Sequence, residues 1–108
     1  MSIKKPKEQD ILTQCLQWLR LHGCFVWRQN QGAFKVQDRF VRFSHQKGIS
    51  DIIGMLPNGR FLAIECKQPS KKPTAVQADF LAEVKAKNGI AICVTSVDEL
   101  ATKVTPLL

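Results

Sequence analysis

Three charged residues stand at the ends of two short apolar segments. Asp51 precedes the run from Ile52 to Leu56, and Glu65 and Lys67 close the run that begins at Phe61. Charged side chains are rarely buried without a partner or a task. Carboxylate oxygens, together with a main-chain carbonyl and water, are the ligands that Mg²⁺ and Mn²⁺ prefer, whereas a charged lysine cannot be a ligand. These residues predict a divalent-cation site; an ordinary ion pair with Asp51 capping a turn is the alternative.

Whether the two acids meet depends on the turn Pro57-Asn58-Gly59 between the segments. A three-residue loop sets Asp51 opposite Glu65, so that both carboxylates share one face. A two-residue loop would instead set Asp51 opposite Cys66, on the wrong face. Pro57 suits the first turn position, and the sequence therefore favours the three-residue loop.

Lys67 is predicted to act on a metal-bound water. Alternate residues of a strand share a face, so Lys67 projects beside Glu65. A lysine ammonium next to a metal-bound water can orient that water, lower its pKa and stabilise the charge that builds up when a phosphodiester is attacked. Hydrolysis of a phosphodiester is the chemistry that this combination fits.

A helix expected from Lys7 to His22 contributes a further acid. At 100° per residue its apolar positions centre over Glu8, whereas Asp10 projects to the solvent side. Glu8 is therefore predicted to lie along the buried stripe; the alternative is a first-turn acid favoured by the helix N-terminus. The apolar positions are Ile11, Leu12, Cys15, Leu16 and Leu19.

The remaining patterns predict an α/β domain with a mixed central sheet flanked by helices and an αβββαβ core. Capping boxes open helices after Thr74 and Ser96. A strand–helix–strand succession implies a right-handed crossover, so the last two strands should be parallel. QNQGAF, residues 29–34, is expected to be a turn or loop. The expected strands are Cys24 to Arg28, Arg39 to Phe43, Ile52 to Leu56, Phe61 to Cys66 and Ile90 to Val94.

Length and composition predict one domain over residues 1–108. A formal net charge of +7 favours a polyanionic partner, of which nucleic acid is the commonest in the cytoplasm. No signal peptide and no apolar run of membrane-spanning length is visible, so a cytoplasmic protein without membrane association is expected. The four cysteines form no CxxC pair and are expected to be reduced thiols.

Taken together, these features resemble the PD-(D/E)XK nucleases, and within them the virus-type replication-repair nuclease (VRR-NUC) family. The resemblance rests on an acid in the first helix, Gly48-Ile49-Ser50-Asp51 before an apolar strand, Glu65-Cys66-Lys67, and Gln77 opening the next helix. It covers essentially the whole chain. One departure is Ser50, where a proline often precedes the aspartate.

The resemblance implies a restriction-endonuclease-like fold and a role for each motif residue. Asp51, Glu65 and the main-chain carbonyl of Cys66 would hold Mg²⁺ or Mn²⁺, and Lys67 would serve the attacking water. Glu8 would add a carboxylate, directly or through water. Gln77 would face the site and contact water or DNA, although the capping box explains this glutamine equally well.

The implied activity is that of a metal-dependent endodeoxyribonuclease. Stand-alone family members resemble Holliday-junction-resolving enzymes, and a symmetric homodimer would suit two matched cuts. Larger members act on flaps and crosslink-repair intermediates, so a flap or single-strand nuclease is the alternative. Genes of this type are common in phages, which fits DNA replication, repair or recombination. A non-catalytic basic nucleic-acid-binding module is the alternative from another class.

Residues outside the motifs are expected to contact the phosphate backbone of DNA, with plain surface or loop as the competing interpretation of each. Trp18 and Trp27 are expected to pack in a core or an interface rather than to stack on bases. The expected DNA contacts are Arg28, Asn30, Arg42, Lys47, Lys71 and Lys72.

Overall fold

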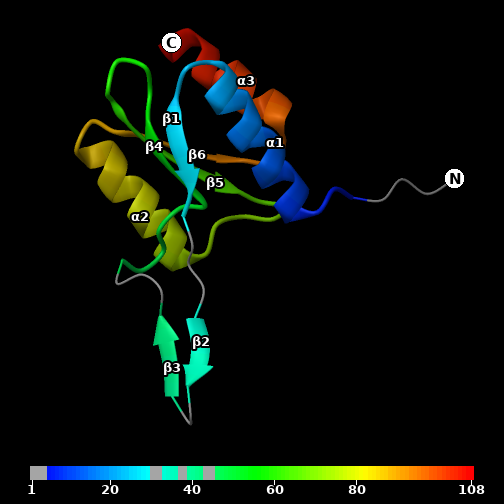
Figure 1. Cartoon of the computed structure of the whole chain (residues 1–108), viewed down its shortest axis with the longest axis vertical. Coiled ribbons are helices and arrows are strands. Elements are labelled where there is room, and N and C mark those ends of the chain that lie inside the picture. Colours follow the sequence, from blue (N-terminus) through cyan, green and yellow to red (C-terminus); the bar gives the residue numbers. More distant parts are fainter. Residues whose placement is uncertain (1–4, 30–32, 37–38, 43–45) are drawn as a thin grey trace, which may run out of the picture.

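A four-stranded sheet forms the centre of the computed structural model, which describes residues 5–29, 33–36, 39–42 and 46–108. The strand order is β1 (Phe25–Arg28), β4 (Ile52–Met55), β5 (Phe61–Cys66) and β6 (Ile90–Val94) (Figure 1). The first three are antiparallel neighbours, and β5 pairs in parallel with β6. The predicted mixed sheet, with its last two strands parallel, is confirmed.

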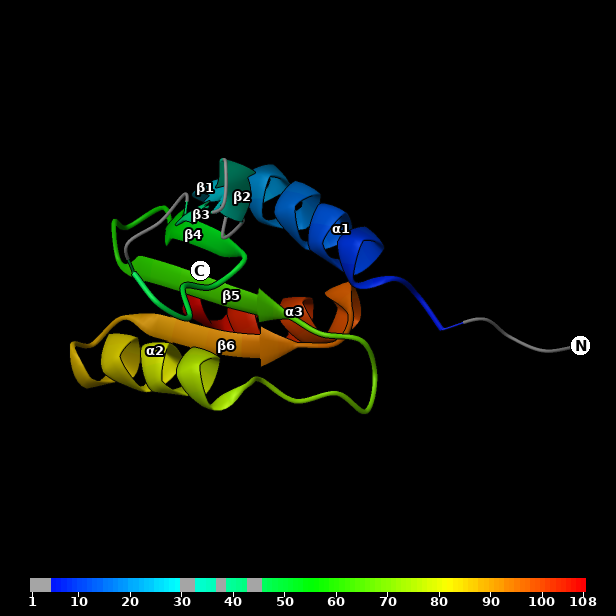
Figure 2. The same ribbon diagram turned by 90° about the horizontal axis from the view of Figure 1, so that it is seen from below.

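Helices cover both faces of this sheet. α1 (Glu8–Leu21) and α3 (Val97–Val104), which continues into the short 3₁₀ helix η1 (Thr105–Leu107), pack on one face. α2 (Ala75–Ala86) packs on the other, against β5 and β6 (Figure 2). Among the described residues, no helix combines the length and hydropathy that a membrane crossing requires.

Alternation along β5 divides the core in two. Leu62, Ile64 and Cys66 point into the larger apolar cluster beneath α1 and α3. Ala63 points into the smaller cluster beneath α2. Because the strand period is two, Glu65 shares the face of Ala63, as predicted, and this is the α2 side of the sheet.

β2 (Ala33–Val36) and β3 (Arg39–Arg42) pair with each other as a separate antiparallel ribbon, which Figure 1 shows extending away from the central sheet. β3 matches the strand expected from Arg39. The interpretation of residues 29–34 as turn or loop alone was wrong, because residues 33–34 belong to β2. The alternation of Phe34 and Val36 with a lysine between them has the strand period of two, which the neighbouring glutamines and glycine obscured.

α2 begins with the predicted capping box. The side-chain oxygen of Thr74 accepts from the Gln77 backbone N–H at 3.3 Å, and Gln77 Oε1 accepts from the Thr74 N–H at 2.9 Å. Two backbone donors that have no partner within the helix are thereby satisfied.

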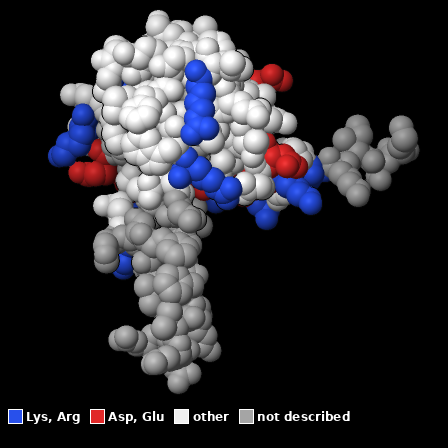
Figure 3. Space-filling view, viewed as in Figure 1, with Lys and Arg blue, Asp and Glu red and all other residues white. Residues whose placement is uncertain are grey.

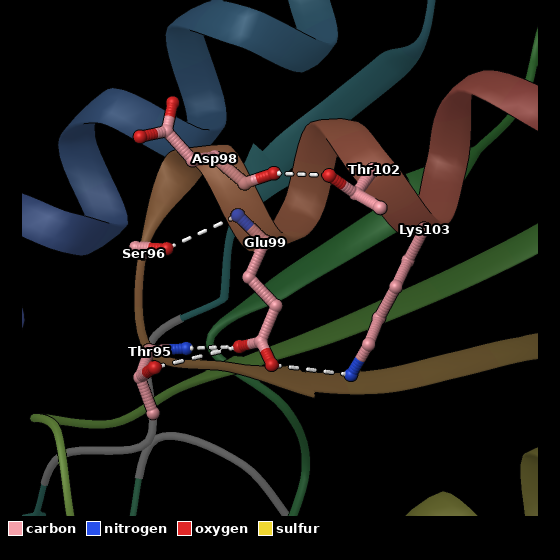
Figure 4. Close-up of polar contacts among 6 residues, drawn as sticks. All are labelled: Thr95, Ser96, Asp98, Glu99, Thr102 and Lys103. Atoms are coloured by element: carbon pink, nitrogen blue, oxygen red, sulfur yellow. Dashed lines mark hydrogen bonds and ion pairs between the residues drawn. The ribbon is translucent and has the colours of Figure 1, made fainter.

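At α3 only half of the predicted box is present. Ser96 Oγ accepts from the Glu99 N–H at 3.0 Å, but Glu99 Oε1 accepts from the N–H of Thr95 at 2.7 Å, one residue before the cap (Figure 4). Glu99 Oε2 also accepts from Lys103 Nζ at 3.3 Å. The glutamate thus ties the end of β6 to the first and last turns of α3.

The turn between β4 and β5 has the predicted three-residue form. A main-chain hydrogen bond of 2.9 Å links the two residues that flank Pro57-Asn58-Gly59. The strand ladder pairs Ile52 with Ile64, so the next position sets Asp51 opposite Glu65. The alternative of a two-residue loop, which would set Asp51 opposite Cys66 on the other face, is wrong.

Gly54 lets β1 approach β4, and its replacement tests this packing. A Cβ at Gly54 would overlap the Phe25 carbonyl oxygen, whereas one at Gly59, which has φ +87°, meets nothing within 4 Å. We expect Gly54→Ala to lower the free energy of unfolding by at least about 2 kcal/mol. Gly59→Ala should lower it by only about 1 kcal/mol, for backbone strain alone. Equal losses in urea denaturation would contradict this account.

Candidate metal centre

Three carboxylates meet at one end of the sheet. Glu8 is the first residue of α1, Asp51 directly precedes β4, and Glu65 is the penultimate residue of β5. One ligand oxygen from each lies within 4.8 Å of the other two. Residues separated by 57 positions of sequence are thus brought together by the docking of α1 beside the β4–β5 hairpin.

Glu8 occupies the position that the helical periodicity indicates. It is half-buried, while Asp10 is exposed, and Ile11 and Leu12 on the same side of α1 are buried in the core. Burial of these apolar residues anchors the first turn of α1 against the sheet and so carries Glu8 to the other two acids.

Asp51 is held by two main-chain interactions. Its Oδ2 accepts from the Cys66 N–H at 2.9 Å, and its carbonyl accepts from the Gln29 N–H at 2.7 Å. The first bond joins Asp51 to β5 and the second joins it to the end of β1. The bond from Cys66 fixes one carboxylate oxygen of Asp51 toward β5.

Glu65 is the most constrained member of the group. It is 1% exposed, and neither of its carboxylate oxygens has a hydrogen-bond partner among the described residues. Burial raises the pKa of Glu65 from 4.5 to about 9, and the nearby Asp51 charge adds to the rise. A buried anion without a partner is unfavourable, so this carboxyl needs either a proton or a cation.

Lys67 lies beside Glu65 but does not fully compensate it. Lys67 Nζ is 4.0 Å from Glu65 Oε1, which is too long for a hydrogen bond, and the side chain is 12% exposed. Three carboxylates thus gather at a place where Lys67 brings one positive charge beside Glu65. The surplus of negative charge is what a divalent cation would neutralise.

The donor set fits Mg²⁺ or Mn²⁺. One oxygen from each of the three carboxylates lies within 4.8 Å of the other two, so the side chains would have to close together around an ion that takes oxygen ligands at about 2.1 Å. Both orphaned oxygens of Glu65 would then gain a partner or a neighbouring positive charge, so the buried acidic triad could hold such an ion.

Cys66 meets this site through its backbone. Its thiol is fully buried on the opposite side of the sheet, under α1 and α3. The N–H and C=O of one strand residue point toward the same neighbouring strand. Since the Cys66 N–H bonds to Asp51, its carbonyl belongs on that side as well, where the resemblance places a ligand.

Gln77 and the residues expected to contact DNA lie outside the acidic group. Gln77 is half-buried, with Oε1 engaged in the α2 cap, so contact of its amide with water or DNA stays a prediction. Arg28, Lys47, Lys71 and Lys72 are exposed. Arg42 is on β3, and Asn30 lies outside the described residues. Basic side chains are spread over the face in Figure 3 rather than gathered in one patch.

Two polar features at this end of the sheet were not predicted. Arg28 Nη2 donates to Gln9 Oε1 at 2.8 Å, which connects the end of β1 to the residue after Glu8. Ser50 is fully buried and its hydroxyl has no partner among the described residues. The position of Gln9 next to Glu8 could have indicated that Gln9 lies near the site and bonds to a residue there. Nothing in the sequence indicated that Ser50 is buried.

The two tryptophans differ. Trp18 is half-buried, packs against the core and stacks on His22 with ring centroids 3.8 Å apart. Trp27 is 39% exposed and is not a core residue, which corrects the expectation for the core. The cause is its position on the edge strand, where Val26 takes the buried side and Trp27 the other.

No model of a known protein family matches the chain, and no curated protein matches it either.

The buried carboxyl of Glu65 should make stability depend on pH. Its pKa of about 9 when folded, against 4.5 ordinarily, means that the folded chain retains a proton that the unfolded chain releases. Stability without metal therefore falls as pH rises from about 4.5 to about 9. We expect Glu65→Gln to raise the melting temperature at pH 8 by at least about 4 °C, and by less at pH 5.

Thermal scans with and without Mn²⁺ complete this test. Glu65→Gln should lose most of the stabilisation that Mn²⁺ confers on the wild type. Glu83→Gln, on the exposed side of α2, is the matched control and should behave as the wild type. Identical pH profiles and identical Mn²⁺ responses for wild type and Glu65→Gln would contradict both the pKa and the ligand assignment.

Proposed function

We propose that the chain is a Mg²⁺- or Mn²⁺-dependent DNA endonuclease with the PD-(D/E)XK fold, similar to the VRR-NUC family. The observation that carries the proposal is the convergence of Glu8, Asp51 and Glu65 within 4.8 Å, with Lys67 beside Glu65. An ordinary surface ion pair does not require a glutamate that is almost fully buried and has no hydrogen-bond partner among the described residues.

The residues of the chain divide the work of phosphodiester hydrolysis. Asp51 and Glu65 would hold the metal with the Cys66 carbonyl, and Glu8 would join directly or through water. When bound, the ion would supply the positive charge that makes water a better nucleophile and offsets charge developing on the phosphate. Lys67 would orient the attacking water and stabilise negative charge with its ammonium group. Partial burial strengthens that effect.

A junction-resolving role is the preferred substrate assignment. A domain of 108 residues offers little surface for a large DNA, and a homodimer would present two sites for two matched cuts. All four cysteines are free thiols, which suits a reducing cytoplasm. Cutting of flaps or single strands is the alternative activity.

A cleavage panel tests the proposal. Labelled four-way junction, flap, duplex and single-stranded DNA are each incubated with Mg²⁺, Mn²⁺ or EDTA. We expect cleavage with either metal and none in EDTA, with the junction cut fastest and in symmetric pairs. Faster flap or single-strand cutting would favour the alternative nuclease. DNA binding with no cleavage in any metal would instead support the basic module, which the net charge of +7 favours.

Lys67→Ala separates catalysis from binding. We expect this variant to cut the preferred DNA about 10²- to 10³-fold more slowly, because a charge-stabilising group is lost from the reacting centre. DNA affinity in EDTA at fixed salt should stay close to that of the wild type. Lys87→Ala removes an equal charge from an exposed position on the C-cap of α2 and is the control. Wild-type cleavage by Lys67→Ala would refute the role of this lysine.

A further inference from the structure

β1 exposes two aromatic side chains at the edge of the sheet. Phe25 is 67% exposed and Trp27 is 39% exposed, with Val26 between them buried in the core. Their ring centroids are 5.5 Å apart in an edge-to-face arrangement. We call this pair the aromatic platform. Neighbouring apolar side chains that are exposed together are a feature of interaction sites.

The aromatic platform lies on the same face of the sheet as the metal centre. Trp27 pairs with Ile53, which projects to the α2 side as Glu65 does. Ile53 stands two positions after Asp51, so the Trp27 and Asp51 Cα atoms are separated by roughly 7 Å along the strands and roughly 5 Å across them. A group resting on Trp27 would therefore belong to the part of a ligand nearest the acids.

Trp27 is held in a set orientation. Its indole Nε1 donates to Gln29 Oε1 at 3.2 Å, and the Gln29 N–H donates to the Asp51 carbonyl at 2.7 Å. The ring is thus connected through one residue to the backbone of a predicted metal ligand. A pre-oriented ring loses little freedom when a planar group stacks on it.

We propose that the aromatic platform stacks unpaired nucleobases of single-stranded DNA next to the phosphate that is cut. The inference rests on the proposed function. It adds a property of the substrate: the bases next to the cut phosphate are unpaired, as they are in a flap or at an opened branch point. Stacking on aromatic rings is tolerant of sequence because every base has a π face.

The surroundings favour DNA over a second copy of the chain. The net charge of +7 attracts a polyanion. Arg28, directly after Trp27, is exposed and held by Gln9 where a phosphate could reach it. The outer edge of β1 is also blunted, because Arg20 Nη2 donates to the Val26 carbonyl at 3.2 Å, which hinders pairing with another strand.

Binding to matched oligonucleotides in EDTA tests the platform. A labelled oligo-dT is compared by fluorescence anisotropy with an abasic oligonucleotide of the same length and charge. We expect the wild type to bind oligo-dT more tightly, and Trp27→Leu to lose about 5- to 100-fold of that affinity while its binding to the abasic strand is unchanged. Phe25→Leu should show a smaller loss. Phe61→Leu, an exposed aromatic on β5, is the control and should bind as the wild type.

A second readout uses an almost unaltered protein. Of the two tryptophans, Trp18 can be replaced by Phe so that Trp27 alone reports. Oligo-dT should quench its fluorescence, and the abasic strand should not. Equal binding of both strands by the wild type, or oligo-dT binding unaffected by Trp27→Leu, would overturn the inference. So would a dimer in light scattering that Trp27→Leu disperses without DNA, since a second copy would then cover the platform.

The outcomes also separate this inference from the proposed nuclease. Base-dependent binding with no cleavage in any metal would leave the platform standing and refute the nuclease. Metal-dependent cleavage with base-independent binding would refute the platform alone.

Discussion

The structure is organised around a carboxylate that is deprived of water. Glu65 stands on a central strand, and the packing around it excludes solvent from its oxygens, which have no hydrogen-bond partner in the part of the chain that the structure describes. A protein interior seldom tolerates such a group, because the charged form loses its hydration and gains little in return. Two further acids beside it, Asp51 and Glu8, raise the electrostatic demand instead of relieving it. An arrangement of this kind is unfavourable for stability alone and favourable for holding a cation.

The packing of apolar residues in the core holds the three acids together despite their mutual repulsion. The larger core cluster anchors α1 against β5 with buried leucines, isoleucines and cysteines, and the first turn of α1 delivers Glu8. The β4–β5 ladder and a tight loop deliver Asp51 and Glu65 to the same level of the sheet. Three independent local patterns thus place the acids at the same site: the apolar stripe of α1 places Glu8, the alternation along β5 places Glu65, and the length of the β4–β5 turn places Asp51. Agreement of this kind across levels is a feature of sequences that specify one structure.

The acidic group was predictable because each of its positions depends on local periodicity. Glu8 follows from the spacing of apolar residues in one helix, and the facing of Asp51 follows from the length of one turn. The hydrogen bonds from Cys66 and Gln29 to Asp51 and the burial of Ser50 depend on how the loop preceding β4 folds over the sheet, which no local pattern reports. β2 was missed because the neighbouring glutamines and glycine obscured the alternation of Phe34 and Val36. The expectation that Trp27 packs in the core was wrong, because an aromatic residue in a short strand is buried only when another layer covers its face, and α2 packs on β5 and β6 instead. The alternative that Trp27 packs in an interface stays a prediction.

The main-chain bond between Gln29 and the Asp51 carbonyl has a consequence for how this fold can vary. β1 and β4 are neighbours in the sheet, yet the chain between them makes an excursion that includes the β2–β3 ribbon. The bond closes the base of that excursion, and it does so at the level of the acids. A longer or shorter ribbon would change the entropy of this excursion only slowly with length, and the bond at its base would remain. Insertions and deletions in the appendage should therefore disturb the arrangement of the acids less than changes at its root.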